Sequence, residues 1–429
     1  MQVNLVLDES APVRYATGMS MYFAQGIPKG LLHIAMPAWL ASQGVAPGEI
    51  ASYLAIIILP WAFKLVTGPL MDRYEFLVMG RRRPWVLLAQ FGMVCSLLML
   101  ALIDDPMEQM GLLILVGVLI NAFSATQDVA TDGMSIDFVP PTEQGRLNAF
   151  MSFGKAIGWA ITSAVSGVLL VTWGLAVTAF VAAAGASVFF FLLIFVRERR
   201  GERLLPWTAG AAVIEHVEEK SFAAVFASLN KVLWQRGSLV VLAIMFFHGL
   251  WNGYGDALMP IAAINLFGYT TVQWSQLVAV MGLVGALGAL AFGPLIDRFG
   301  AKNMLMLTIA LVAMHAFLIA QTQQLWQDTT YVRVMLSIWV TMDPVVMVCV
   351  IALAMAICSE EISATQFAIY MSAANLGTSL GSKAYGLVAE QSTYVENYTL
   401  LGLFVLLMFV VVVLHRHPLD QGISRGAKS

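Results

Sequence analysis

Long apolar runs alternate with short polar connections along most of this chain. The runs Pro84–Ile103 and Asn397–Leu414 carry no charged residue, and each is long enough for one membrane-spanning helix of about 20 residues. Ala156–Val196 and Ala257–Ile296 are charge-free over lengths that fit two such helices each. The strict alternation of apolar and polar residues that marks membrane barrel strands is absent. The pattern therefore predicts a bundle of membrane-spanning helices.

We place twelve helices by this pattern. They run near residues 15–42, 48–70, 84–103, 110–136, 146–171, 173–196, 238–266, 272–294, 303–321, 330–358, 365–390 and 396–415. The basic residues of the connections then fall almost entirely at one set of helix ends, since the opposite set holds only Arg333. Because basic residues favour the cytoplasmic side, this asymmetry predicts that both termini are cytoplasmic.

One long polar connection, residues 197–237, divides the chain. It predicts a six-helix bundle over 1–196, a cytoplasmic linker over 197–237, and a second six-helix bundle over 238–429. Within the linker, Ser221–Trp234 has apolar residues at near-helical spacing, which predicts a short helix on the membrane surface.

The two halves share sequence echoes. Gly68–Tyr74 (GPLMDRY) returns as Gly293–Phe299 (GPLIDRF), six helices later. A second echo, FMS at 150–152 and YMS at 370–372, is followed by glycine pairs that allow close helix packing, at Gly154 and Gly158 and at Gly377 and Gly381. The repeat is parallel, which predicts two bundles related by pseudo-two-fold symmetry.

Composition excludes several classes of protein. Hydrophobic residues make up 59% and charged residues 11% of the 429 positions, against about 25% charged in soluble domains. The net charge of −3 offers no attraction to nucleic acid. The sequence contains no phosphate-binding GxxxxGK[ST] motif, and its three cysteines lack metal-ligand spacing. We therefore expect a membrane protein that is not an enzyme and has no cofactor.

The paired loops predict a gate. Asp72 and Asp297 can face the positive N-terminus of a neighbouring helix, while Arg73 and Arg298 can reach carboxylates on adjacent helices. Such contacts can break and re-form when two bundles move. The alternative is that these basic residues only set the topology, which is also how we interpret the run Arg81–Arg83.

Further motifs resemble a known family. They are Lys64–Arg73, Arg82–Trp85, Ala125–Asp132 (ATQDVATD), Gly255–Leu258 (GDAL) and Ala364–Ala368 (ATQFA). The paired loops resemble the major facilitator superfamily, and the finer motifs resemble its peptide–acetyl-coenzyme A transporter branch, the AmpG-like permeases. This resemblance implies uptake of a muropeptide, with a siderophore or an acyl-coenzyme A as alternative cargo. It also places Gln127 among the gating residues.

Two carboxylates lie deep in the fourth predicted helix. Asp128 and Asp132 are four residues apart and project from one face. Close carboxylates can share a proton near neutral pH, which suits proton coupling together with Asp256. The alternative is that Arg73, Arg146 or Lys155 clamps one or both of them.

Lysines within predicted spans favour an anionic cargo. Lys29 follows Gly26 and Pro28, which predict a local break in the first helix, and His33 lies one turn further on. Lys155 lies on the fifth helix and Lys64 on the second. Lys29, His33 and Lys155 are candidate cargo ligands, whereas Lys64 is placed with the gate. The alternative is ion pairing of these lysines with Asp128, Asp132, Asp256 or Asp343.

The seventh predicted helix offers further candidate ligands. Trp251, Asn252 and Asp256 lie among three glycines that loosen the helix, and Asn375 on the eleventh helix is equivalent by repeat to Lys155. Trp251 could equally serve helix packing. We expect a cavity lined by the first, fourth, fifth, seventh, tenth and eleventh helices.

These patterns together predict a secondary-active, proton-coupled importer of a bulky polar or anionic solute. We expect a monomer in the bacterial inner membrane whose partners are the solute, protons and lipid, with no nucleic acid. The alternative class is a membrane scaffold that shares the fold and transports nothing. Such a scaffold would not need the buried charges.

Overall fold

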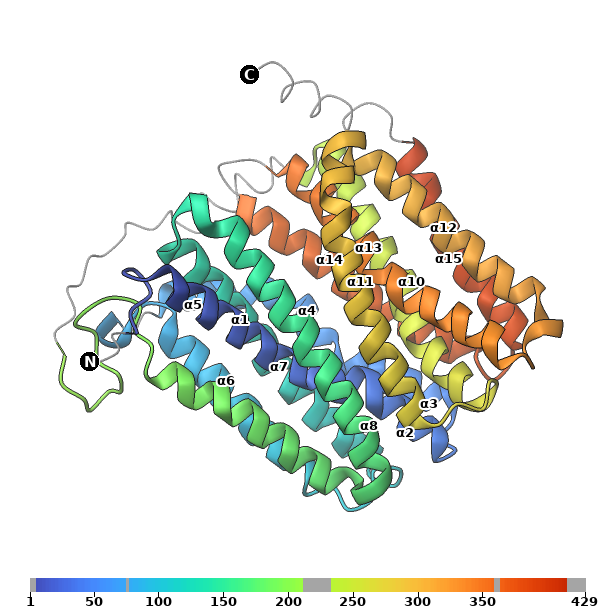
Figure 1. The fold of residues 1–429 in the computed structure, drawn as a ribbon, viewed down its shortest axis with the longest axis horizontal. Helices are drawn as coiled ribbons and strands as arrows, with labels where there is room; N and C mark the ends of the chain where they lie inside the picture. The colour runs from blue at the N-terminus through green and yellow to red at the C-terminus, as the bar shows by residue number, and fades with distance from the viewer. Residues whose placement is uncertain (1–4, 75–76, 211–232, 359–362, 415–429) are drawn as a thin grey trace. The chain divides into compact units, whose positions relative to one another are not determined.

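A computed structural model describes residues 5–74, 77–210, 233–358 and 363–414 (Figure 1). Within these ranges the chain is helical, and its only extended pairing is an isolated bridge between Val6 and Arg197. Eight helices of the described part are long and apolar enough to cross a membrane. The predicted surface helix at Ser221–Trp234 lies almost wholly outside the described residues.

The chain divides into two compact units, described separately below. Unit 1 comprises Met1–Trp39 and Phe63–Glu218, and unit 2 comprises Leu40–Ala62 and Glu219–Ser429.

Unit 1 is built from helices of both its segments. In chain order they are α1 (Ala11–Pro28), the π-helix η1 (Lys29–Ala35), the start of α2 (Met36–Ser42), α5 (Lys64–Arg73), the short η2 (Leu77–Met79), α6 (Arg83–Leu100), α7 (Met110–Phe138) and α8 (Pro141–Ile194). The backbone of α8 leaves helical geometry at Gly174, where φ is 78°. This break separates the two helices predicted over 146–171 and 173–196.

Unit 2 contains the remaining helices. They are α3 (Pro47–Ile57), α4 (Leu59–Ala62), α10 (Arg236–Asn265), α11 (Thr271–Phe299), α12 (Ala301–Gln321), the short η3 (Gln323–Leu325), α13 (Thr329–Ile357), α14 (Ser363–Val388) and α15 (Tyr394–Leu414). Local sequence explains several helix starts. Thr270 and Gln273 form a reciprocal capping box before α11, and the Asp328 carboxylate accepts two backbone N–H bonds at the start of α13.

The first two predicted helices are both interrupted. Lys29–Ala35 adopts π-helical geometry directly after Pro28, which is where the sequence predicted a break. The predicted helix 48–70 was wrong as a single element, because the chain is broken at Ile58 and at Phe63. Pro60 lies between these breaks and has no N–H to donate to an unbroken helix.

The glycine pairs of the sequence echo pack alike in the two units. In unit 1 a Cβ on Gly154 or Gly158 of α8 would overlap the carbonyl oxygen of Met19 or Phe23 on α1. In unit 2, Gly377 and Gly381 of α14 meet the carbonyl oxygens of Phe246 and Leu250 on α10 in the same way. The predicted close helix approach is confirmed, and it repeats with the same four-residue step.

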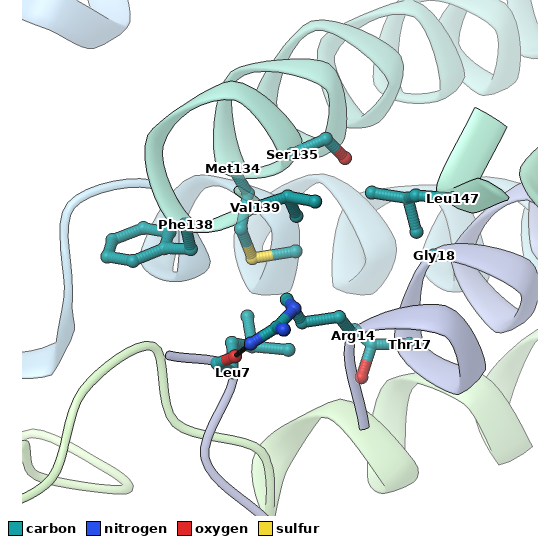
Figure 2. A pocket seen from close by; sticks show the side chains of 9 residues that line it. All are labelled: Leu7, Arg14, Thr17, Gly18, Met134, Ser135, Phe138, Val139 and Leu147. Atoms are coloured by element: carbon teal, nitrogen blue, oxygen red, sulfur yellow. Dashed lines mark hydrogen bonds between the residues drawn. The ribbon is translucent and has the colours of Figure 1, made fainter. Parts of the chain in front are cut away.

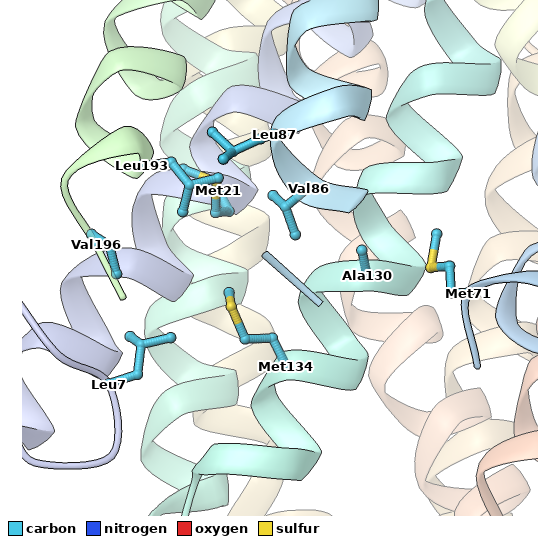
Figure 3. Packing of buried hydrophobic residues seen from close by; sticks show 9 residues of the cluster. All are labelled: Leu7, Met21, Met71, Val86, Leu87, Ala130, Met134, Leu193 and Val196. Atoms are coloured by element: carbon cyan, nitrogen blue, oxygen red, sulfur yellow. The ribbon is translucent and has the colours of Figure 1, made fainter. Parts of the chain in front are cut away.

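An apolar cluster closes one end of unit 1 (Figure 3). Side chains from the N-terminal segment, from the five helices α1, α5, α6, α7 and α8, and from the segment just after α8 meet there: Leu7, Met21, Met71, Val86, Leu87, Ala130, Met134, Leu193 and Val196. Leu7 is only 3% exposed, so the segment before α1 is part of the core of this unit.

Candidate functional site

A buried ion pair links α5 and α7 in unit 1. The Lys64 ammonium lies 2.7 Å from the carboxylate of Asp128, and the two side chains are 11% and 5% exposed. Lys64 is the first residue of α5, so the break at Phe63 places its side chain against α7. Of the four carboxylates considered for Lys64, the structure therefore places Asp128 at the ammonium.

The second carboxylate has a different partner. The hydroxyl of Tyr22 on α1 donates to Asp132 at 2.5 Å, one helical turn beyond Asp128. The two acids thus share one face of α7 but differ in environment, since one faces an ammonium and the other a phenol.

Two further lysines extend this cluster. The Lys155 ammonium lies 5.3 Å from the centre of the Tyr22 ring, and the Lys29 ammonium lies 5.8 Å from the centre of the Trp159 ring. Aromatic faces attract cations at such distances. The close α1–α8 packing brings these residues together, and Lys29 lies at the first position of the π-helix. We call Lys29, Lys64, Lys155, Asp128, Asp132 and Tyr22 the charged cluster.

Other predicted residues of unit 1 join neighbouring helices. His33 is hydrogen-bonded to Asn121 of α7 at 3.2 Å. Gln127 is fully buried and donates from its side-chain amide to the carbonyl oxygen of Met21 at 3.1 Å, so it ties α7 to α1. Asp72 and Arg73 belong to α5, but their side chains lie outside the described part of the structure.

In unit 2 the predicted residues fall into separate environments. Asn252 donates to the carboxylate of Asp343 on α13 at 2.7 Å. Trp251 is 1% exposed and packs edge-on against His248 and Trp339, which matches its packing alternative. From the sequence, Asp343 was considered only as an ion-pair partner of a lysine. Pro344, which follows it inside α13, was the feature of the sequence that indicated a disturbed helix at this point.

The remaining candidates in unit 2 do not converge on Asp343. Asp256 is exposed, and Asn375 donates to the carbonyl oxygen of Trp61 at 3.2 Å. Asp297 and Arg298 are exposed at the end of α11, where the Arg298 guanidinium lies 5.2 Å from the centre of the Phe299 ring.

The buried residues Arg83 and Glu198 connect the start of α6 to the end of α8, at one end of unit 1, through hydrogen bonds to backbone groups. Arg83 has no exposed surface, and its guanidinium donates to five backbone carbonyls, including those of Leu193 and Ile194 at the end of α8. Glu198 accepts the backbone N–H groups of Arg81, Arg82 and Arg83. The interpretation of this arginine run as a topology marker was therefore incomplete, because Arg83 is a core residue.

The pKa of Glu198 differs from that of an ordinary glutamate. Burial, with the nearby Glu202 carboxylate, raises the pKa of Glu198 to about 7, against the opposing effect of the three N–H donors. Burial also raises the pKa of Glu202. These residues lie outside the spans, and sequence reasoning missed them because Glu198 and Arg83 are 115 positions apart.

A small pocket lies beside this end of unit 1 (Figure 2). It is lined by Leu7, Arg14, Thr17, Gly18, Met134, Ser135, Phe138, Val139 and Leu147. Arg14 donates to the carbonyl oxygen of Leu7 at 2.8 Å and to the Glu143 carboxylate at 2.6 Å. Its charge is thus already matched within the unit, and the pocket is separate from the charged cluster.

Membrane-spanning helices, a repeated helix-packing motif and ionisable groups within the spans define a membrane transporter. The model of the Major Facilitator Superfamily matches residues 18–382. The chain belongs to this superfamily.

Relatives include named permeases. The chain is similar to "Anhydromuropeptide permease" of Escherichia coli (strain K12), with 27% identity over 153 residues, 36% of this chain and 31% of that protein. It is 32% identical over 141 residues to an uncharacterized protein of Haemophilus influenzae, 32% of this chain and 33% of that protein. The chain spans about a third of the length of these two relatives. "Putative transporter AmpG 4" of Rickettsia conorii is 22% identical over 369 residues, 82% of this chain and 84% of that protein.

Solved structures share the fold. The crystal structure of the nucleoside transporter NupG matches with a TM-score of 0.69 and 12% sequence identity, over 94% of this chain and 98% of that one. At this identity the likeness concerns the fold alone.

Proposed function

We propose that this protein is a proton-coupled, secondary-active importer of a bulky polar anion, with a muropeptide as the first candidate. In this proposal twelve spans form two six-helix bundles that alternate in exposing the solute, and a monomer in the bacterial inner membrane has both termini in the cytoplasm. The observation that carries the proposal is the charged cluster of unit 1, because ionisable groups within spans are costly and usually functional.

The charge balance of the cluster supports an anionic cargo. Three lysines accompany two carboxylates, so the cluster carries a positive surplus when all five groups are ionised. Lys29 is exposed and lies against Trp159, so its ammonium is accessible to a ligand. A carboxylate or phosphate that binds there would bring the cluster to neutrality, which lowers the cost of holding charge within the membrane.

The two acids suit different roles. Asp128 is held by the Lys64 ammonium, which stabilises its charged form. Asp132 accepts a hydrogen bond from the Tyr22 hydroxyl, so its negative charge lacks a full opposing charge at that distance. Asp132 is therefore the better carrier of the coupled proton, and Lys64–Asp128 the better structural or gating pair.

The nature of the cargo rests on relatives. Relatives of this chain carry the names anhydromuropeptide permease and putative transporter AmpG 4, and the match to the second covers most of both chains. A muropeptide is anionic, which fits the positive surplus of the charged cluster. A siderophore or an acyl-coenzyme A shares that description and remains the alternative cargo.

Uptake into proteoliposomes tests the proposal. Purified protein should accumulate a radiolabelled anhydromuropeptide only when an inward proton gradient is imposed, and Asp132→Asn should abolish this dependence. Lys29→Gln should raise KM for the anion, whereas Lys383→Gln, a matched change of an exposed lysine on α14, should not. Uptake that ignores the gradient would refute the coupling, and competition by an acyl-coenzyme A or a siderophore alone would reassign the cargo.

A further inference from the structure

Among the buried side-chain polar atoms of unit 1 that have no hydrogen-bond partner in the described residues, four belong to three residues of α1 and α7. These four atoms are the amide nitrogen and the amide oxygen of the Gln25 side chain, the amide oxygen of the Gln127 side chain and the hydroxyl oxygen of Thr131. The three side chains are 2%, 0% and 0% exposed. An unsatisfied buried group costs about 1–3 kcal/mol, so native proteins rarely leave several of them together.

These atoms lie on the neighbouring surfaces of α1 and α7. The Gln127 amide nitrogen reaches the carbonyl oxygen of Met21 at 3.1 Å and the Met21 sulfur at 3.7 Å. Gln25 follows Met21 by one helical turn, and Thr131 follows Gln127 by one turn. Gln25 also lies near Asp128, although neither of its polar atoms makes a hydrogen bond of normal geometry.

The chemistry of the four atoms selects the ligand. The Gln25 amide nitrogen donates, the two amide oxygens accept, and the Thr131 hydroxyl does both. A metal cation would use only the acceptors. It would also be repelled by the nearby Lys64 ammonium, which already pairs with the Asp128 carboxylate. An anion would use only the donors. Water serves both roles and needs two to four such partners.

We propose that ordered water binds between α1 and α7 at Gln25, Gln127 and Thr131, and relays protons to the acids of α7. The relay rests on the proposed proton coupling, whereas the water site does not. A water that accepts a proton from one neighbour passes a different proton to the next and ends unchanged. The Tyr22 hydroxyl gives its proton to Asp132 and takes one from the bound water, which is reprotonated from the aqueous phase on the proton-rich side, so the net result is one proton moved from that phase to Asp132.

Hydroxyl-radical footprinting of the full-length protein in lipid nanodiscs tests the site without any cargo. X-ray radiolysis of bound water generates radicals next to the Met21 sulfur, although Met21 is only 1% exposed. We expect Met21 to oxidise at least about fivefold faster than Met408, which is 0% exposed within apolar α15, because water is the local radical source. Protection of Met21 equal to that of Met408 would overturn the proposal.

Variants identify the groups that hold the water. Thr131→Val keeps the shape of the side chain, and together with Gln25→Leu it should reduce Met21 oxidation to the level of Met408. Thr308→Val, which alters a buried threonine whose hydroxyl is already bonded to Met304, should leave Met21 oxidation unchanged. Equal oxidation in the Thr131→Val, Gln25→Leu protein and in the wild type would overturn the assignment. So would a rise in Tm that requires sodium, which would indicate a cation instead.

The relay is tested separately. In proteoliposomes Thr131→Val should slow gradient-driven uptake while leaving the KM of the solute unchanged. If this variant transports at the wild-type rate, the water is structural and the relay is refuted. If the wild type transports nothing, the proposed function fails while the footprint still decides the water site.

Discussion

Glu198 and Arg83 cap each other's helices. The Glu198 carboxylate accepts the backbone N–H of Arg83 at 2.5 Å at the start of α6, and the Arg83 guanidinium donates to the carbonyl oxygen of Ile194 at 2.7 Å at the end of α8. A carboxylate suits the positive start of a helix and a guanidinium suits the negative end of one. The pair therefore joins two helices of unit 1 without a direct salt bridge between the side chains among the described contacts.

The raised pKa of Glu198 predicts that its contribution to the stability of the fold falls as the pH rises. Burial raises its pKa to about 7, so between its unfolded value of 4.5 and 7 the folded state holds a proton that the unfolded state has lost. This contribution is complete below pH 4.5 and is lost as the pH rises through 7. It amounts to at most about 3 kcal/mol from the size of the shift.

Thermal unfolding of the purified protein measures this effect. Glu198→Gln should flatten the fall in Tm between pH 5 and pH 7.5, because an amide does not titrate. The charged groups near Glu198, namely Glu202 and Arg83, and the three backbone N–H donors are unchanged in the variant. A wild-type slope that persists in Glu198→Gln would show that other groups set it.

Replacement of Arg83 should destabilise unit 1 strongly. Arg83→Lys keeps the charge but loses most of the five hydrogen bonds that the guanidinium donates to backbone carbonyl groups. We expect a loss of about 3 kcal/mol or more, since Arg83 is itself fully buried and several partly buried carbonyl groups lose their donor. Denaturant or thermal unfolding measures it, with Arg200→Lys as the control because that side chain is 73% exposed. Equal effects of the two changes would contradict the role of Arg83.

Glycine at the α1–α8 crossing should be irreplaceable. Gly154→Ala would place a Cβ against the carbonyl oxygen of Met19, and neither backbone can yield cheaply. We expect a loss of about 1–3 kcal/mol from overpacking, and a corresponding fall in Tm. Gly111→Ala is the matched control on α7, where a Cβ would meet nothing, and it should be neutral or slightly stabilising. A neutral Gly154→Ala would mean that the helices can separate.

Local sequence patterns predicted most of the helices and the close approach of their small residues. The break after Pro28 and the glycine contacts of α8 follow from steric properties of single residues, so they could be predicted without a structure. Pro60 carried the same signal, but hydropathy alone joined 48–70 into one helix.

Tertiary partners could not be predicted in this way. Glu198 caps a helix 115 residues earlier in the chain, and nothing around Glu198 indicates that partner. The four carboxylates open to Lys64 were equivalent in sequence, and the geometry of α5 against α7 selects Asp128. Long-range polar contacts depend on packing that is decided by the whole chain.

The Lys64–Asp128 pair should show strong energetic coupling. Lys64→Gln leaves the Asp128 carboxylate buried without its ammonium, and Asp128→Asn leaves the ammonium without its carboxylate. Each single change should cost about 3–5 kcal/mol, because a buried charge remains that has lost its direct partner. The double variant Lys64→Gln, Asp128→Asn removes both charges and should recover a large part of that loss. Unfolding of all four proteins gives the coupling energy, and simple additivity of the two changes would refute a direct pair. If the double variant is stable yet transports nothing, the pair serves the transport cycle, whereas full activity would restrict it to stability.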